Sequence, residues 1–157
     1  MTRILGTVLA LVLVVALSRG ASAQTYGYSA RNPCANEALM SSPSTASISI
    51  AATAGTTQLV AAPTGQALFG GGTAQVFICG YEFTISGTTP SFQWAYGTGT
   101  NCGTGTTNMT GAEVVTSGTR VQSTVGMYLA APGGNAVCIV AGGTTPTVGG
   151  WMWYVVQ

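Results

Sequence analysis

Few side chains in this sequence could do acid–base chemistry. Its only carboxylates are Glu37, Glu82 and Glu113, and it contains no His, Lys or Asp. Glu82 and Glu113 are the one pair that could act as acid and base in glycoside hydrolysis, which needs two carboxylates. Because such sites usually carry further polar and ionic groups, we interpret both as solvated strand residues. We therefore predict no catalytic residues and no enzyme activity.

The cysteines point to cross-links instead of a metal centre. There are four of them, and neither a C-x-x-C spacing nor a His is present to complete a metal site, so we expect no metal and no cofactor. An even count in an exported chain predicts two disulfides, for which three pairings exist. We favour Cys34–Cys79, joining an N-terminal arm to a core strand, and Cys102–Cys138, tying a Gly-Thr-rich loop to a late strand.

Aromatic side chains could form a site that stacks on sugar rings. The candidates for ligand stacking are Trp94, Tyr96, Trp151 and Trp153. Strand alternation places Trp151 and Trp153 on one face and points Tyr154 the other way. The alternative is core packing, the commoner use of such rings in a β-protein. Burial of all three tryptophans would exclude the platform, whereas two or three on one exposed, flat face would favour it.

The N-terminus has the organisation of a secretory signal peptide. Residues 1–3 carry a positive charge, residues 4–17 are mostly apolar, and Ala21-Ser22-Ala23 matches the A-x-A cleavage pattern. We expect residues 1–23 to be removed and the protein to be secreted, extracellular or periplasmic. Residues 24–44 follow as an irregular arm and residues 45–157 as one domain. No later segment is apolar for long enough to predict a membrane span.

Short alternating segments separated by turns predict an all-β domain. The expected strands are residues 45–52, 57–61, 75–86, 91–96, 112–115, 119–125, 127–130, 136–141 and 151–156. Turns are expected at 87–90, 132–135 and 142–150, and a loop at 97–107. The spacing predicts a disulfide-bonded β-sandwich or jelly roll of about eight or nine short antiparallel strands.

The charge composition excludes some partners and favours self-association. Only 4% of residues are charged. After cleavage, two arginines face three glutamates, which leaves a net charge of −1 and no basic surface for nucleic acid. Soluble β-proteins guard their edge strands with Lys, Pro or inward charges, and this chain has no Lys. We expect self-association through strand edges, with the arm adding a strand to a neighbour, unless loops and bulges cover the edges.

Two segments resemble a known group of sequences. Residues 76–112 read V-F-I-C-G-Y-E-F-T-I-S-G-T-T-P-S-F-Q-W-A-Y-G-T-G-T-N-C-G-T-G-T-T-N-M-T-G-A, and a later segment reads N-A-V-C-I-V-A-G-G-T-T-P-T-V-G-G-W. They resemble loosely characterised Gly/Thr-rich, low-charge β-sandwich proteins of phage-related and environmental bacterial origin. The resemblance implies a virion-associated or extracellular structural role. Because a signal peptide is unusual in a virion protein, the balance shifts to a secreted surface or matrix protein.

The sequence thus predicts an exported, non-enzymatic structural protein of an extracellular or surface assembly, such as a matrix, filament or coat subunit. The alternative is a secreted carbohydrate-binding module that uses exposed Trp and Tyr, with a glycan as partner. Asn108-Met109-Thr110 fits the N-glycosylation pattern, which matters only in a host with that machinery.

Overall fold

The computed structural model describes residues 33–34, 44–67, 72–123 and 129–157, all within one compact unit, Arg31–Gln157. The predicted signal peptide and most of the predicted arm lie outside the described residues. In the described part of the chain, no helix is long and apolar enough to cross a membrane.

Eight antiparallel strands form one sheet, so the predicted all-β class is confirmed. They are β1 (Ser44–Ile50), β2 (Gly55–Val60), β3 (Val76–Thr98), β4 (Thr104–Asn108), β5 (Glu113–Val114), β6 (Thr119–Ser123), β7 (Leu129–Ala131) and β8 (Ala136–Val156). A 3₁₀ turn, η1 (Thr100–Cys102), and β4 occupy the predicted loop at 97–107. The single continuous sheet does not confirm the details of a sandwich or a jelly roll.

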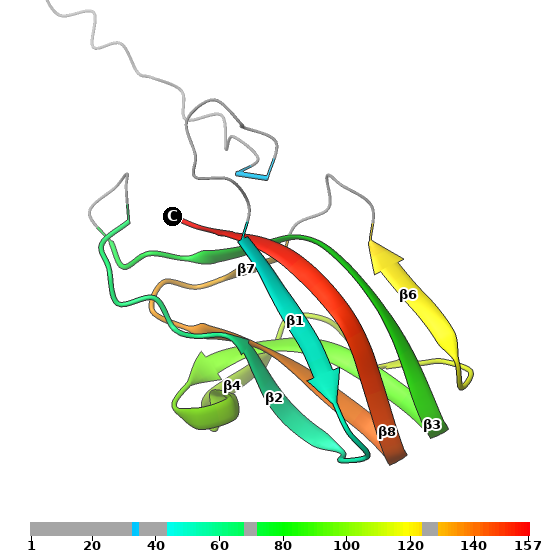
Figure 1. Ribbon diagram of the computed structural model, residues 1–157. Helices are drawn as coiled ribbons and strands as arrows, with labels where there is room; N and C mark the ends of the chain where they lie inside the picture. Colours follow the sequence, from blue (N-terminus) through cyan, green and yellow to red (C-terminus); the bar gives the residue numbers. More distant parts are fainter. Residues whose placement is uncertain (1–32, 35–43, 68–71, 124–128) are drawn as a thin grey trace, which may run out of the picture. The chain divides into compact units, whose positions relative to one another are not determined.

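Two long strands dominate the fold (Figure 1). β3 and β8 pair along their lengths, from Val76 opposite Val156 to Gly97 opposite Ala136. Residues 87–90 and 142–150 were predicted as turns between separate strands, and this was wrong. The chain bends there without reversing, and the pairing resumes on the other side with a shifted register.

The bends have a common sequence and a common geometry. Gly-Thr-Thr-Pro occurs at 87–90 in β3 and at 143–146 in β8, and Thr88 lies opposite Thr144. In each bend the glycine and the second threonine have positive φ, and the proline is fully buried. These left-handed residues change the direction of a strand, and proline fixes φ immediately afterwards. The affected residues are Gly87 (139°), Thr89 (47°), Gly143 (98°) and Thr145 (47°).

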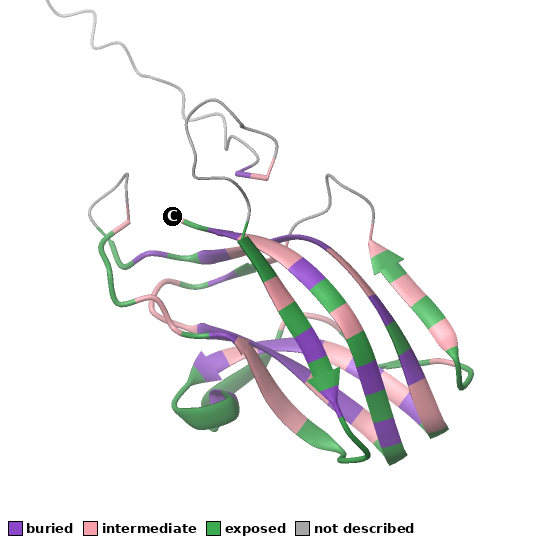
Figure 2. Ribbon diagram, in the orientation of Figure 1, coloured by how far each residue is buried: buried purple, intermediate pink, exposed green. Residues whose placement is uncertain are grey.

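The bends fold the sheet into two halves whose inner faces pack together. One half contains β1, residues 147–156 of β8, residues 76–86 of β3, and β6; the other contains β2, residues 136–142 of β8, residues 91–97 of β3, and β4. Phe83 of the first half contacts Phe92 and Trp94 of the second, with ring centroids 5.0 and 6.4 Å apart. Figure 2 shows the resulting alternation of buried and exposed residues along β1, β3 and β8.

The pairing also reveals an internal repeat. Before the bend, β6 pairs with β3 and β2 pairs with β8. After the bend, β5 pairs with β3 and β1 pairs with β8. Each long strand carries a disulfide cysteine near its start, Cys79 or Cys138. The units β1–β2–β3 and β5–β6–β8 are therefore equivalent in topology, and the two short strands of each unit pair with the long strand of the other.

Both favoured disulfides are present. Cys34–Cys79 and Cys102–Cys138 have S–S distances of 2.03 and 2.05 Å, and no free cysteine is found among the described residues. Cys79, Cys102 and Cys138 are buried, so the cross-links are part of the packed structure.

Candidate functional site

The four aromatic residues predicted for ligand stacking do not lie together. Trp94 is fully buried at the centre of the core, against Phe83 and Tyr81. Tyr96 is half-buried on the same inner side of β3 and packs against that core. These two residues are therefore packing residues in this fold, whereas Trp151 and Trp153 lie elsewhere.

Trp151 and Trp153 share the outer face of the β1–β8–β3–β6 half. Trp151 lies between Ser47 of β1 and Glu82 of β3, and 46% of its surface is exposed. Trp153 lies opposite Gly80, where an added Cβ would be 3.5 Å from the indole Cε2. The ring of Trp153 therefore lies against β3 at Gly80 and is half-buried, whereas the ring of Trp151 is exposed.

Polar side chains surround Trp151 on this face. Residues that lie opposite one another in adjacent strands point to the same side of the sheet, so Ser47, Trp151, Glu82 and Gln122 form one row across four strands. We call this surface the Trp151 face; it consists of Ser47, Glu82, Arg120, Gln122, Trp151 and Trp153.

An ion pair orders the carboxylate of this face. The Arg120 guanidinium lies 2.6 Å from Glu82 Oε1, and the Glu82 side chain is 25% exposed. A charge-assisted bond of this kind restricts the carboxylate to a few orientations. Glu82 therefore presents a positioned hydrogen-bond acceptor beside the exposed indole.

One side of Trp151 is left open. The next outward residue along β8 is Gly149, and a Cβ built there would meet nothing within 4 Å. A flat molecule can therefore approach the exposed ring without contacting a bulky neighbour on that side.

The two glutamates once considered as an acid and base lie in different halves of the sheet. Glu82 lies opposite Trp151 and is paired with Arg120, whereas Glu113 lies on β5 opposite Phe92. Burial raises the pKa of Tyr81; the neighbouring Trp94 side chain opposes this shift and the charge of Glu113 adds to it. Trp94 Nε1 nevertheless forms no hydrogen bond of normal geometry.

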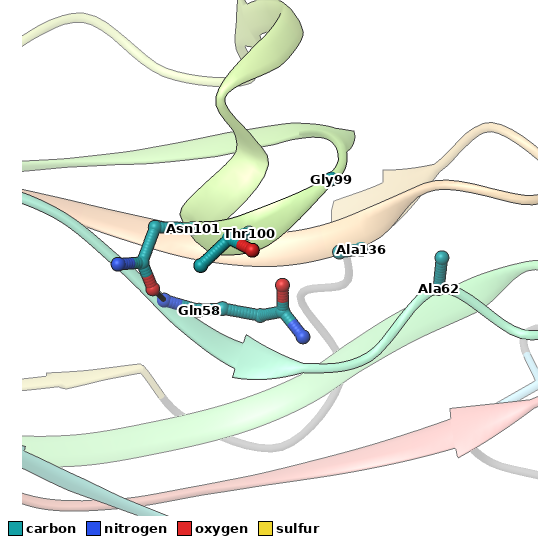
Figure 3. Close-up of a pocket in the computed structure, with 6 residues that line it drawn as sticks. All are labelled: Gln58, Ala62, Gly99, Thr100, Asn101 and Ala136. Atoms are coloured by element: carbon teal, nitrogen blue, oxygen red, sulfur yellow. Dashed lines mark hydrogen bonds between the residues drawn. The ribbon is translucent and has the colours of Figure 1, made fainter.

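A second feature is a pocket between β2, the residues around η1 and the start of β8 (Figure 3). It is an open pocket of about 400 Å³ lined by Gln58, Ala62, Gly99, Thr100, Asn101 and Ala136. Asn101 Oδ1 accepts a hydrogen bond from the Gln58 backbone N–H at 3.1 Å, which holds the loop against β2. Its lining offers only amide, hydroxyl and methyl groups.

Metal ligands do not cluster in the described part of the chain, where no group of three His, Cys, Asp or Glu residues occurs. No family model, curated protein or solved structure matches this chain. The resemblance to Gly/Thr-rich β-proteins therefore stays a prediction.

Proposed function

We propose that this chain is an exported, non-catalytic structural protein that builds an extracellular or surface assembly. The observation that carries the proposal is the character of strand β1. It ends the order β1–β8–β3–β4, and in the described residues it pairs with β8 alone. An edge of this kind presents backbone N–H and C=O groups that can pair with another chain.

β1 lacks the features that normally prevent such pairing. Its seven residues, Ser44–Ile50, include no charged residue and no proline. β6, which borders the same half on the other side, carries the charged Arg120. The difference makes β1 the favoured edge of this half, and addition of a second copy there would extend the sheet by the β-augmentation mode.

The chemistry of the chain supports a role that depends on contact and not on turnover. The carboxylate of Glu82 is engaged by Arg120, and Glu113 lies in the other half of the sheet. The two disulfides suit an oxidising compartment, and the A-x-A pattern at residues 21–23 supports export.

Sedimentation velocity of the protein without residues 1–23 tests the proposal. We expect larger species to grow with protein concentration. Ser44→Lys places a charge on an exposed β1 position, and we expect it to shift the population towards monomer. Thr116→Lys, at an exposed position between β5 and β6, is the matched control and should assemble as the parent does. A parent protein that stays monomeric at high concentration would refute assembly.

The predicted contribution of the arm needs a separate variant. Removal of residues 24–44 would also remove Cys34 and break its bond to Cys79. Removal of residues 24–32 leaves both disulfides possible. Loss of assembly in this variant alone would assign assembly to the arm, whereas assembly that survives would exclude these residues of the arm as its cause.

A further inference from the structure

We infer that the Trp151 face is a binding site for a neutral polysaccharide chain. The inference goes beyond the proposed structural role, because it assigns a ligand to a different surface of the molecule. It stands on three observations: the exposure of Trp151, the ordered polar groups beside it, and the absence of net charge across the six residues of this face.

The exposure of Trp151 is informative because the same chain shows how it packs a tryptophan. Trp94 is fully buried between the two halves of the sheet, whereas nearly half of Trp151 faces solvent. A single exposed apolar side chain is common on proteins and is not by itself a site. The neighbours of Trp151 must therefore show what the ring can hold.

Those neighbours match the chemistry of a sugar ring. A pyranose has an apolar face of C–H groups, which can lie on an indole, and hydroxyl groups around its rim. Ser47 and Glu82 lie one strand away on either side of Trp151, about 4.8 Å in each direction. Rim hydroxyls of a stacked sugar can thus donate to the Glu82 carboxylate and exchange hydrogen bonds with Ser47.

The row extends beyond one sugar. Gln122 lies opposite Glu82 on β6 and offers both an acceptor and two donors. Trp153, next outward along β8, gives a second, half-buried ring. The surface is open, in contrast to the concave sites that enclose small molecules, so each sugar makes few contacts. A polymer that repeats these contacts is the ligand such a face can retain.

The charge of the Trp151 face indicates which class of polysaccharide it can bind. The Trp151 face carries one carboxylate and one guanidinium, and the 2.6 Å ion pair between Glu82 and Arg120 neutralises both. No unpaired cation remains among its six residues to attract an anionic glycan. A neutral chain needs no charged partner to bind there, whereas an anionic chain would give up its hydration on a face that offers no net positive charge in return.

The test is depletion of the protein, without residues 1–23, from solution by insoluble neutral polysaccharides, namely cellulose, chitin and a β-1,3-glucan. Pectate, an anionic chain, serves as the comparison. We expect depletion by at least one neutral polymer and little by pectate. Trp151→Ala should weaken binding about tenfold or more, and Glu82→Gln should weaken it less.

Two further variants keep the outcome decisive. Val114→Ala removes an apolar side chain that is 70% exposed on β5, in the other half, and should bind as the parent does. Circular dichroism of each variant establishes that the fold is retained. Depletion by none of the three neutral polymers, or equal binding by Trp151→Ala, would overturn the inference. If Trp151→Ala changes sedimentation and not depletion, the face is a contact between copies and the inference fails.

Ser44→Lys separates this inference from the proposed assembly. Ser44 lies opposite Tyr154, so its side chain points to the other side of the sheet from Trp151. We expect a monomeric Ser44→Lys protein to bind the polymer with lower avidity and to remain sensitive to Trp151→Ala. Binding without assembly would leave the site intact and refute only the structural proposal.

Discussion

Thr88 in β3 and Thr144 in β8 lie opposite one another at the point where both long strands bend. Each threonine sits in a Gly-Thr-Thr-Pro segment, and the two segments have the same pattern of positive φ angles. Because the bends coincide, the paired strands β3 and β8 fold over together and keep their hydrogen bonds on both sides of the bend. The inner face of one half then packs against that of the other. Trp151 lies on the outer face of the half that contains β1 and β6.

The bends predict a sharp contrast between two glycines of β8. Gly143 has φ of 98°, and an added Cβ would lie 2.7 Å or less from the carbonyl oxygens of Thr88 and Thr89. Gly149 has open space around its Cβ position. We expect Gly143→Ala to lower the free energy of unfolding by more than about 2 kcal/mol and Gly149→Ala to change it by less than about 0.5 kcal/mol. Urea unfolding of the two variants measures this, and equal stabilities would show that the bend does not require glycine.

The same bends mark the limit of what the sequence predicted. Glycine, threonine and proline have the same local chemistry whether a chain reverses or only bends, so the two segments were assigned as turns. Only the continued pairing of Ser91 with Gly142 beyond the bend distinguishes the cases. The Gly-Thr-Thr-Pro repeat itself was visible in the sequence and could have indicated two equivalent units.

Side-chain alternation was informative about faces and silent about which face is buried. It placed Trp151 and Trp153 together, as the structure does. Phe92, Trp94 and Tyr96 share the inner side of β3. Alternation alone does not show whether such a side meets the core or a ligand, because that depends on packing between the two halves. The cysteine count and the predicted export signal, in contrast, were sufficient to predict two disulfides.

Core and surface tryptophans should differ strongly in their contribution to stability. Trp94 contacts Tyr81 and Phe83 and is fully buried, whereas Trp151 is half exposed. We expect Trp94→Ala to destabilise the fold by about 3–5 kcal/mol and Trp151→Ala by less than about 1 kcal/mol. Trp94→Phe, which keeps an aromatic ring, provides an intermediate variant for urea unfolding. If Trp151→Ala loses clearly more stability than about 1 kcal/mol, Trp151 is a structural residue and its assignment to a ligand is weakened.

The Cys102–Cys138 bond should stabilise the protein by restricting the unfolded chain. It joins residues 36 positions apart, and the chain-entropy relation gives about 4 kcal/mol for a loop of that length. The double variant Cys102→Ala/Cys138→Ala should lose about this amount in urea unfolding. It should also loosen η1, which we expect to appear as faster amide exchange at Asn101 and Gly103. Unchanged stability would mean that packing alone holds this loop.

Tyr81 predicts a loss of stability at alkaline pH. Burial raises the pKa of its phenol above the ordinary value near 10, so the folded state holds the proton more tightly than the unfolded state does. The stabilisation is therefore fully present below about pH 10 and is lost as the pH rises through the folded pKa. Urea midpoints measured from pH 8 to pH 11.5 should fall at the upper end, and Tyr81→Phe should reduce that fall. Tyr154→Phe, which removes a partly buried phenol from β8, is the matched control. If the urea midpoints of Tyr81→Phe and of the parent protein fall in parallel, groups other than Tyr81 cause the loss of stability.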